Sequence, residues 1–208
     1  MANKSEFERG AEWRQWDLHI HTPASFHWLG KRFGTDPNSV ENIALVDEMI
    51  ASLNAAQPSV FALMDYWTFD GWFALKRRLA QKGAPKLMKR VFPGIELRLM
   101  APMIGRLNAH VLFSDKIEDQ MLHDFRAALT VELVNRPLSD DSLVALARMT
   151  IEEKLNTLGF KKADIEANED NALRAGSMIA EINCDSYKNA IRRVPNGYAI
   201  GFMLMALL

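Results

Sequence analysis

Apolar and polar residues alternate in short runs through the first half of the chain, and this pattern predicts strands separated by helices. The run Trp16–His21 alternates and stops before Thr22-Pro23, which is typical of a strand that leads into a loop. The continuous apolar run Val60–Met64 predicts a strand that is covered on both faces. Two further strands are predicted at Arg90–Leu97 and Ala109–Phe113.

Helical spacing of apolar residues fills the gaps between these strands and dominates the second half. Asp70 is the predicted N-cap of one of the helices. Only two strand candidates follow residue 115, at Val131–Val134 and Tyr198–Leu204. The predicted helices are Ser39–Ala56, Gly71–Ala80, Ile117–Leu129, Ser139–Leu158 and Glu169–Val194.

This order of elements predicts an α/β fold, specifically a partial or distorted β/α, TIM-like barrel with a helix-rich C-terminal half. The whole chain, 1–208, is expected to form a single domain. Within it we expect a β/α half over 10–115 and a mostly helical half over 116–208.

Composition narrows the class of protein. With 25 basic and 26 acidic residues the net charge is −1, which excludes a broad electrostatic grip on nucleic acid or anionic lipid. A single cysteine, Cys184, excludes an internal disulfide framework and a cysteine-based zinc site. The polar start of the chain and the lack of a long apolar run predict a cytoplasmic protein without a membrane segment.

The strongest chemical signal is the segment Asp17-Leu18-His19-Ile20-His21. Alternate residues of a strand share a face, so Asp17, His19 and His21 are expected to point the same way. Two imidazoles at this spacing can hold a divalent metal, and Asp17 could orient one of them by a hydrogen bond. The alternative is a pair of buried structural histidines.

Three more candidates belong to the following predicted strands. Asp65 follows the second strand, Glu96 lies near the end of the third, and His110 lies in the fourth. In a parallel β/α barrel such residues converge at one mouth, where histidine and carboxylate ligands suit Zn, Mn or Fe. Taken singly, each could instead be a hydrogen-bonded structural group. Arg98, two residues beyond Glu96, is expected either to contact a phosphate or to form a rim salt bridge.

Four segments resemble motifs of the PHP (polymerase and histidinol phosphatase) superfamily. They are Asp17–Phe26, Ala62–Tyr66, Pro93–Glu96 and Asn108–Val111. Together with Trp13–Trp16 and Asp70–Trp72, they are most similar to the N-terminal PHP domain of PHP–ATPase proteins, in which an SMC-like or AAA-like ATPase follows. The resemblance covers residues 10–115. It implies a PHP-type barrel that binds two or three metals, hydrolyses phosphoesters and takes part in nucleic-acid metabolism and phage defence.

Residue by residue, the resemblance implies a set of roles. His19 and His21 would hold the first metal, Glu96 would bridge two metals, and His110 would bind the second. His27 stands where some members have a third-metal histidine, with a surface histidine as the alternative. If the site is complete, Asp65 could position a water or accept its proton.

The chain departs from the family pattern in two ways. Tyr66 replaces the usual second-motif histidine, so we expect it to contact the metal ligands rather than the metal. The family's later histidine and Asp-x-His motifs have no counterpart, and His123, the only histidine after His110, is expected to face solvent. The helical half would replace the missing strands, or the chain would be the N-terminal piece of a longer PHP–ATPase.

The sequence thus favours a metal-dependent phosphoesterase with two divalent ions, or fewer if the site is incomplete, acting on a phosphate-containing substrate such as nucleic acid or a nucleotide. One alternative is a catalytically degenerate PHP-like module that binds or regulates an ATPase partner. An amidohydrolase also places His-x-His on a first barrel strand, but the Pro93–Glu96 element argues against it.

Overall fold

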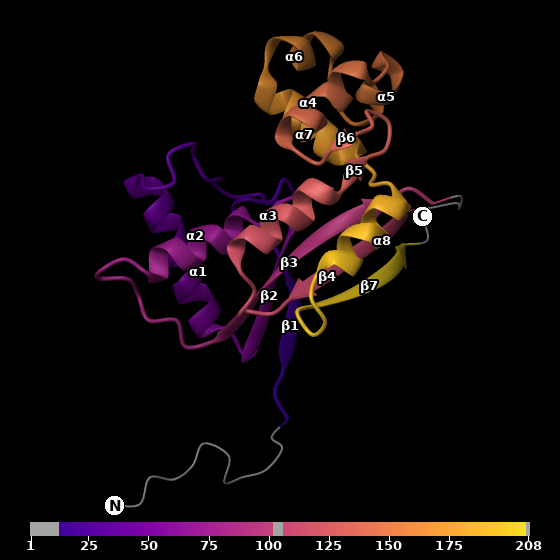
Figure 1. Ribbon diagram of the computed structural model, residues 1–208. Helices are drawn as coiled ribbons and strands as arrows, with labels where there is room; N and C mark the ends of the chain where they lie inside the picture. Colours follow the sequence, from indigo (N-terminus) through magenta and orange to yellow (C-terminus); the bar gives the residue numbers. More distant parts are fainter. Residues whose placement is uncertain (1–12, 102–105, 207–208) are drawn as a thin grey trace, which may run out of the picture.

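Five strands form one mixed sheet in the computed structural model, which describes residues 13–101 and 106–206 (Figure 1). The sheet order is β1-β2-β3-β4-β7. The strands are β1 (Trp16–Ile20), β2 (Val60–Tyr66), β3 (Arg90–Leu99), β4 (Arg106–Phe113) and β7 (Ala199–Ala206). The two ends of the predicted domain, residues 1–12 and 207–208, lie outside the described residues.

The predicted parallel arrangement is confirmed for the first three strands only. β1, β2 and β3 pair in parallel, whereas β4 and β7 each pair antiparallel with their neighbour. Only residues 100–105 separate β3 from β4, and a parallel return requires a crossover of a dozen or more residues. His110 therefore enters the site from a strand that runs opposite to the other three, a correction to the predicted parallel barrel.

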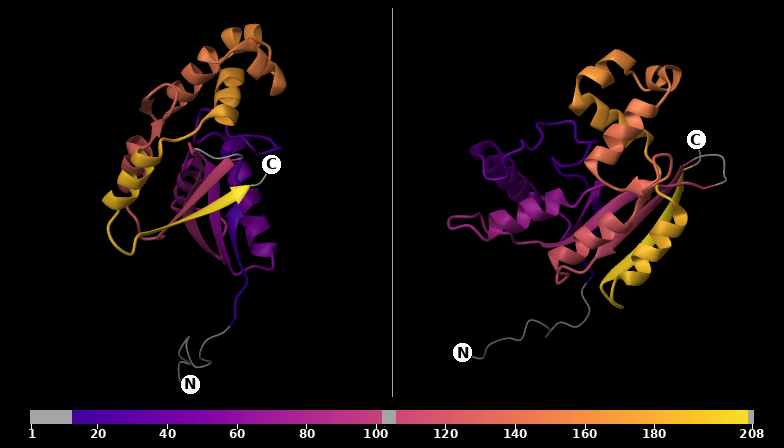
Figure 2. Two further views of the ribbon diagram at one scale, coloured as in Figure 1. Left: turned by 90° about the vertical axis from the view of Figure 1, so that its right-hand side faces the viewer. Right: turned by 45° about the horizontal axis from the view of Figure 1, so that its top comes forward.

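Four helices contribute to the core beside the sheet. Leu63, Ile95 and Val111 lie on one face of the strands and belong to the same buried cluster as Ile50 and Leu75 of two helices. The left view of Figure 2 shows α3 and α8 next to each other along the sheet. These helices are α1 (Val40–Ala55), α2 (Asp70–Leu79), α3 (Asp119–Ala128) and α8 (Cys184–Arg193).

The first two helices, α1 and α2, begin in different ways. Ser39 caps α1, because its side chain accepts a hydrogen bond from the Asn42 backbone N–H. α2 begins at Asp70 itself, with Phe69 in the cap position and without a side-chain cap, so the predicted N-cap at Asp70 is wrong by one residue. Trp67 and Phe69, which lie between β2 and α2, and Trp72 in α2 are buried in the core.

Four further helices form a cap over one end of the sheet, as the right view of Figure 2 shows. α4 packs against α7, and Gly176 makes this possible, since a Cβ there would lie 1.9 Å from the Leu143 carbonyl oxygen. The cap helices are α4 (Asp140–Met149), α5 (Glu152–Thr157), α6 (Lys162–Ala167) and α7 (Glu169–Ile179).

Two long predicted helices are therefore each broken in two. The helix predicted over Ser139–Leu158 stops at Thr150, whose hydroxyl donates to the Leu146 carbonyl, and a new helix starts after Ile151 in extended conformation. The helix predicted over Glu169–Val194 is interrupted by extended residues, because Ile182 bridges to Leu99. Tertiary pairing overrides the apolar periodicity at the second break.

A small hairpin replaces the strand predicted at Val131–Val134. β5 (Thr130–Val131) pairs with β6 (Arg136–Pro137), and Asn135 between them has a positive φ of 52°. It leads into the cap and adds no strand to the main sheet.

The described residues form a mixed α/β fold in which the sheet remains open. β1 and β7 are its two edges, so the predicted barrel is not closed within residues 13–101 and 106–206. Within the same part of the chain, the structure contains no helix with the length and apolar character needed to cross a bilayer.

Candidate metal site

Strand register brings three polar side chains to one level of the sheet. Glu96 in β3 pairs with Tyr66 in β2 on one side and with His110 in β4 on the other. Paired residues of neighbouring strands project from the same face, so the three side chains meet on the face opposite to Leu63 and Ile95. Glu96 stands at the centre of this group and is only 2% exposed.

Two histidines approach Glu96 from the end of β1. The Nε2 atom of His19 lies 2.9 Å from Glu96 Oε2, and the Nε2 atom of His21 lies 3.7 Å from the same oxygen. One ligand atom from each of His19, His21 and Glu96 falls within 4.8 Å of the other two. We call these three residues the metal group. Their spacing suits a single divalent ion, with the histidine–carboxylate donor set that was expected from the sequence.

His110 lies directly behind the metal group. Its Nε2 atom is 3.5 Å from Glu96 Oε1, and its ring centroid is 4.7 Å from that of His19. Phe202 of β7 stacks on its other side at 5.0 Å. The structure thus brings together His19, His21, Glu96 and His110, the four residues expected to bind metal.

Three imidazole nitrogens of His21 and His110 are buried without a hydrogen-bond partner among the described residues. They are both ring nitrogens of His110 and the Nδ1 atom of His21. An unpaired buried polar atom costs about 1–3 kcal/mol, so such atoms are rare unless they serve a ligand. His110 Nε2 already faces the metal group, and the observed donor set therefore fits a divalent cation.

Hydrogen bonds divide the two oxygens of Glu96 between different tasks. Oε1 accepts from the Tyr66 hydroxyl and, at 3.0 Å, from the Asn108 amide, whereas Oε2 faces His19 and His21. Burial alone would raise the pKa of Glu96, but His110, His19 and Tyr66 together hold that pKa well below its usual range. Glu96 is therefore an anion, as a metal ligand must be.

Burial and the Glu96 carboxylate also shift the pKa values of three neighbouring side chains. The hydrogen bond with Glu96 raises the pKa of His19, whereas burial lowers the pKa of His21. Burial, followed by the bond to Glu96, raises the pKa of Tyr66 to about 12. Tyr66 consequently stays a neutral donor at physiological pH, and it contacts Glu96, one of the residues expected to bind metal.

Asp17 does not take up the position expected for it. Asp17 pairs with Phe61 and Ile20 with Leu63, so β1 has one more residue than β2 over this span and the strict alternation is lost. The Asp17 carboxylate accepts a hydrogen bond from the His19 backbone N–H at 3.2 Å. Its effect on the imidazole is through charge, since it contributes to the raised pKa of His19.

Asp65 is kept away from the metal group by strand alternation. It precedes Tyr66 and so projects from the opposite face, where both its oxygens are 2.7 Å from Thr22, one from the backbone nitrogen and one from the hydroxyl. Burial raises the pKa of Asp65 to about 7. The structure therefore places Asp65 as an anchor for the loop after β1, which is a correction to its expected part in proton transfer.

Arg98 shares the face of Glu96, as expected, but its guanidinium points to the cap. It donates to the Met178 carbonyl at 2.6 Å and lies 5.0 Å from the centre of the Tyr66 ring. The Trp67 indole donates to the Ser177 carbonyl at 3.0 Å. Arg98 and Trp67 thus fasten the end of α7 to the sheet.

The two remaining histidines occupy different surroundings. His27 is exposed in the loop after β1, with its ring 5.9 Å from that of His21 and 4.9 Å from that of Tyr66. It is near the metal group but not one of the three residues that form it. His123 is exposed on α3 and stacks on Phe73 at 4.5 Å, so its predicted orientation toward solvent is confirmed.

Three residues of the site were missed by the sequence analysis. Asn108 stands two positions before His110, so strand alternation alone would have placed it beside Arg98 on the same face. Thr22 and Phe202 carried no such signal, since each acquires its contact from a strand distant in sequence.

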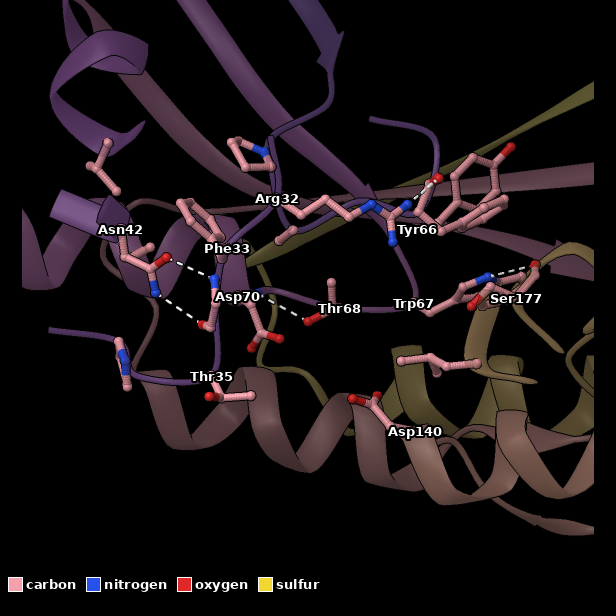
Figure 3. Close-up of a pocket in the computed structure, with 18 of the residues that line it drawn as sticks. Arg32, Phe33, Thr35, Asn42, Tyr66, Trp67, Thr68, Asp70, Asp140 and Ser177 are labelled. Atoms are coloured by element: carbon pink, nitrogen blue, oxygen red, sulfur yellow. Dashed lines mark hydrogen bonds between the residues drawn. The ribbon is translucent and has the colours of Figure 1, made fainter. Parts of the chain in front are cut away.

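A cavity of about 730 Å³, shown in Figure 3, has Tyr66 among the residues that line it. It is enclosed by the loop after β1, by α1 and α2, and by α4 and α7 of the cap. Tyr66 belongs to both places, because its ring lines the cavity and its hydroxyl donates to Glu96. The cavity volume is in the range of small-molecule sites.

The chain was compared with protein families, curated sequences and solved structures. No protein-family model matches the chain, and no curated protein sequence matches it. Among solved structures, it is similar to an amidohydrolase from Chromobacterium violaceum, described with bound sulfate and no metal, at 16% sequence identity and a TM-score of 0.40. The similarity covers 88% of this chain and 56% of the other, so the chain spans little more than half the length of that protein.

Proposed function

We propose that the chain is a metal-dependent hydrolase, and more narrowly a phosphoesterase of PHP type. The observation that carries the proposal is the metal group, in which His19 and His21 meet the buried anion of Glu96 within 4.8 Å. The PHP motifs quoted above contain all three of these residues and His110. The donor set of imidazoles and one carboxylate is compatible with Zn, Mn or Fe.

A bound divalent cation would supply Lewis-acid stabilisation of the charge that develops on a phosphoryl oxygen. His19, His21 and Glu96 would hold it, and His110 would hold a second ion beside Glu96 Oε1. Tyr66 and Asn108 fix the orientation of the Glu96 carboxylate, so that Oε2 stays directed at the two histidines of β1. His27, at the edge of the group, is an exposed imidazole that could act toward a substrate.

The resemblance to PHP–ATPase proteins also supports a proposed setting. We propose a cytoplasmic enzyme that acts on nucleic acid or a nucleotide together with an SMC-like or AAA-like ATPase, as a domain of the same chain or as a separate subunit. A role in phage defence is proposed from the same resemblance. The proposed partners are supported by the motifs alone, and co-purification tests them directly.

A catalytically degenerate module is the second candidate, and one contact favours it. Tyr66, which stands in place of the family's usual histidine, donates to Glu96 Oε1 and so engages the oxygen that a second metal would need. In this reading the chain binds one cation or none and acts by docking on an ATPase.

The test is hydrolysis of bis(4-nitrophenyl) phosphate by the metal-free protein after addition of Mn²⁺. We expect turnover that requires Mn²⁺, that disappears in Glu96→Gln, and that persists in the control His123→Ala. Metal binding without turnover of this diester or of single-stranded DNA would instead support the degenerate module. Turnover of 4-nitroacetanilide but of neither phosphoester would assign the site to an amidohydrolase.

A further inference from the structure

The cavity beside the metal group contains more positive charge than its own acids neutralise. Two of its arginines are paired, Arg126 with Asp140 and Arg78 with Asp47, each at 2.6 Å. Arg174 of α7 also lines the cavity, and no ion pair within 4 Å joins it to another residue in the described part of the chain.

A second arginine of the cavity wall is Arg32, in the loop after β1, and the charge of Arg174 affects its pKa. Burial lowers the pKa of Arg32, the charge of Arg174 lowers it further, and Asp170 opposes the change. Arg32 donates to the Phe26 carbonyl, and in Figure 3 its side chain extends toward Tyr66. Two like charges that influence each other are stabilised by an anion that contacts both.

The remainder of the wall is mostly apolar. Phe33, Ile43 and Leu173 line the space between the loop, α1 and α7. Apolar walls with a few charged groups are typical of sites that bind an organic molecule by its body and orient it by its polar end. A bare inorganic anion would leave these walls in contact with water.

We propose that the cavity binds the non-reacting part of the substrate, an organic anion whose body packs against Phe33 and Leu173 and whose oxyanion contacts Arg32 and Arg174. Arginine matches both phosphate and carboxylate oxygens in a forked geometry, so either group satisfies this chemistry. Tyr66 lines the cavity and donates to Glu96, so the reacting ester of such a ligand would lie beside Tyr66 at the metal group. This inference rests on the proposed function only in treating the ligand as the substrate.

The proposal is tested by titrating the metal-free full chain, in EDTA, with phenyl phosphate, benzoate and inorganic phosphate. Arg174→Ala is the informative variant, because its side chain has no ion-pair partner to lose in the described structure. Arg148→Ala removes an exposed arginine of the same cap outside the cavity and is the control. Arg174→Lys keeps the charge but loses the fork.

We expect phenyl phosphate or benzoate to bind more tightly than inorganic phosphate. Arg174→Ala should weaken this binding about tenfold, Arg174→Lys less, and Arg148→Ala not at all. Preference for phenyl phosphate would identify a phosphate ester as the ligand, and preference for benzoate a carboxylate. Equal affinity of the Arg174→Ala, Arg148→Ala and unaltered chains, or equal affinity for inorganic phosphate, would overturn the proposal.

Glu96→Gln separates this inference from the proposed function. We expect this variant to lose Mn²⁺ binding while it keeps the affinity for phenyl phosphate in EDTA. If the unaltered chain shows Arg174-dependent binding but neither Mn²⁺ binding nor hydrolysis, then the cavity is an anion site and the metal-dependent function is wrong. Mn²⁺ binding and hydrolysis without Arg174-dependent binding of the organic anion would refute the proposed cavity site but not the proposed function.

Discussion

His110 and Glu96 face each other across the antiparallel pair of β3 and β4, with His110 Nε2 3.5 Å from Glu96 Oε1. The contact is buried on both sides and joins the fourth strand to a site otherwise built by parallel strands. Both ring nitrogens of His110 are without a hydrogen-bond partner in the described structure, which is compatible with a cation beside the pair.

His110→Ala should therefore weaken Mn²⁺ binding. Loss of a residue that merely supports a metal ligand costs about 10–100-fold in affinity, so loss of a ligand should cost at least about tenfold. The measurement is calorimetric titration of metal-free protein, with circular dichroism to check the fold. His123→Ala, an exposed imidazole on α3, should bind Mn²⁺ as the unaltered chain does. Unchanged affinity in His110→Ala would exclude His110 as a ligand.

Tyr66→Phe tests whether the tyrosine supports the metal group or obstructs it. The hydroxyl holds Glu96 in place and keeps the pKa of that carboxyl low, so its removal should weaken Mn²⁺ binding about tenfold. Tyr198→Phe, outside the site, should have no effect. Tighter Mn²⁺ binding by Tyr66→Phe would show that the hydroxyl competes with the metal, as the degenerate module requires.

Asp65→Asn should change the pH dependence of stability. The pKa of Asp65 is about 7 in the folded chain, against 3.8 for an unperturbed carboxyl, so the folded state holds this proton more tightly. The unaltered chain should therefore lose stability as the pH rises from about 4 to about 7, at no more than about 1.4 kcal/mol per pH unit, and level off above.

Urea denaturation at several pH values measures this effect. In Asp65→Asn the loss between pH 4 and 7 should be smaller, because the amide can still hydrogen-bond Thr22 but does not titrate. Asp164→Asn, which alters an exposed carboxyl of α6, is the control. Parallel pH profiles for Asp65→Asn and the unaltered chain would contradict the assignment.

Gly176→Ala should loosen the cap. The new Cβ would lie 1.9 Å from the Leu143 carbonyl oxygen, so α4 and α7 must separate, and overpacking of this kind costs about 1–3 kcal/mol. Gly34→Ala is a suitable control, because its Cβ would be 3.8 Å from the nearest atom, an ordinary contact. Equal urea midpoints for Gly176→Ala and Gly34→Ala would show that the two helices are not closely packed.

Much of the sheet and the three residues of the metal group could be predicted from local pattern. The alternation in Trp16–His21 and the apolar run Val60–Met64 locate two strands, and the polar residues at or near strand ends locate His19, His21 and Glu96. These features can be predicted because strand periodicity and polarity are properties of a few neighbouring residues.

The remaining features depend on contacts between distant segments. One extra residue in β1 moves Asp17 out of line, and the opposite direction of β4 sets the level of His110 through its pairing with Glu96. Arg98 follows the expected face but is directed to α7 of the cap, and Asp65 to Thr22. Periodicity cannot indicate such partners, nor the interruption of the predicted helices at Thr150 and Ile182.

Titration of the metal-free chain with Mn²⁺ shows whether Glu96 binds metal. We expect saturable binding of at least one ion per chain, release of protons as the ion binds, and loss of both in Glu96→Gln with the fold intact. Equal Mn²⁺ affinity and stoichiometry in the unaltered chain and Glu96→Gln, or no binding by either, would contradict metal binding by Glu96.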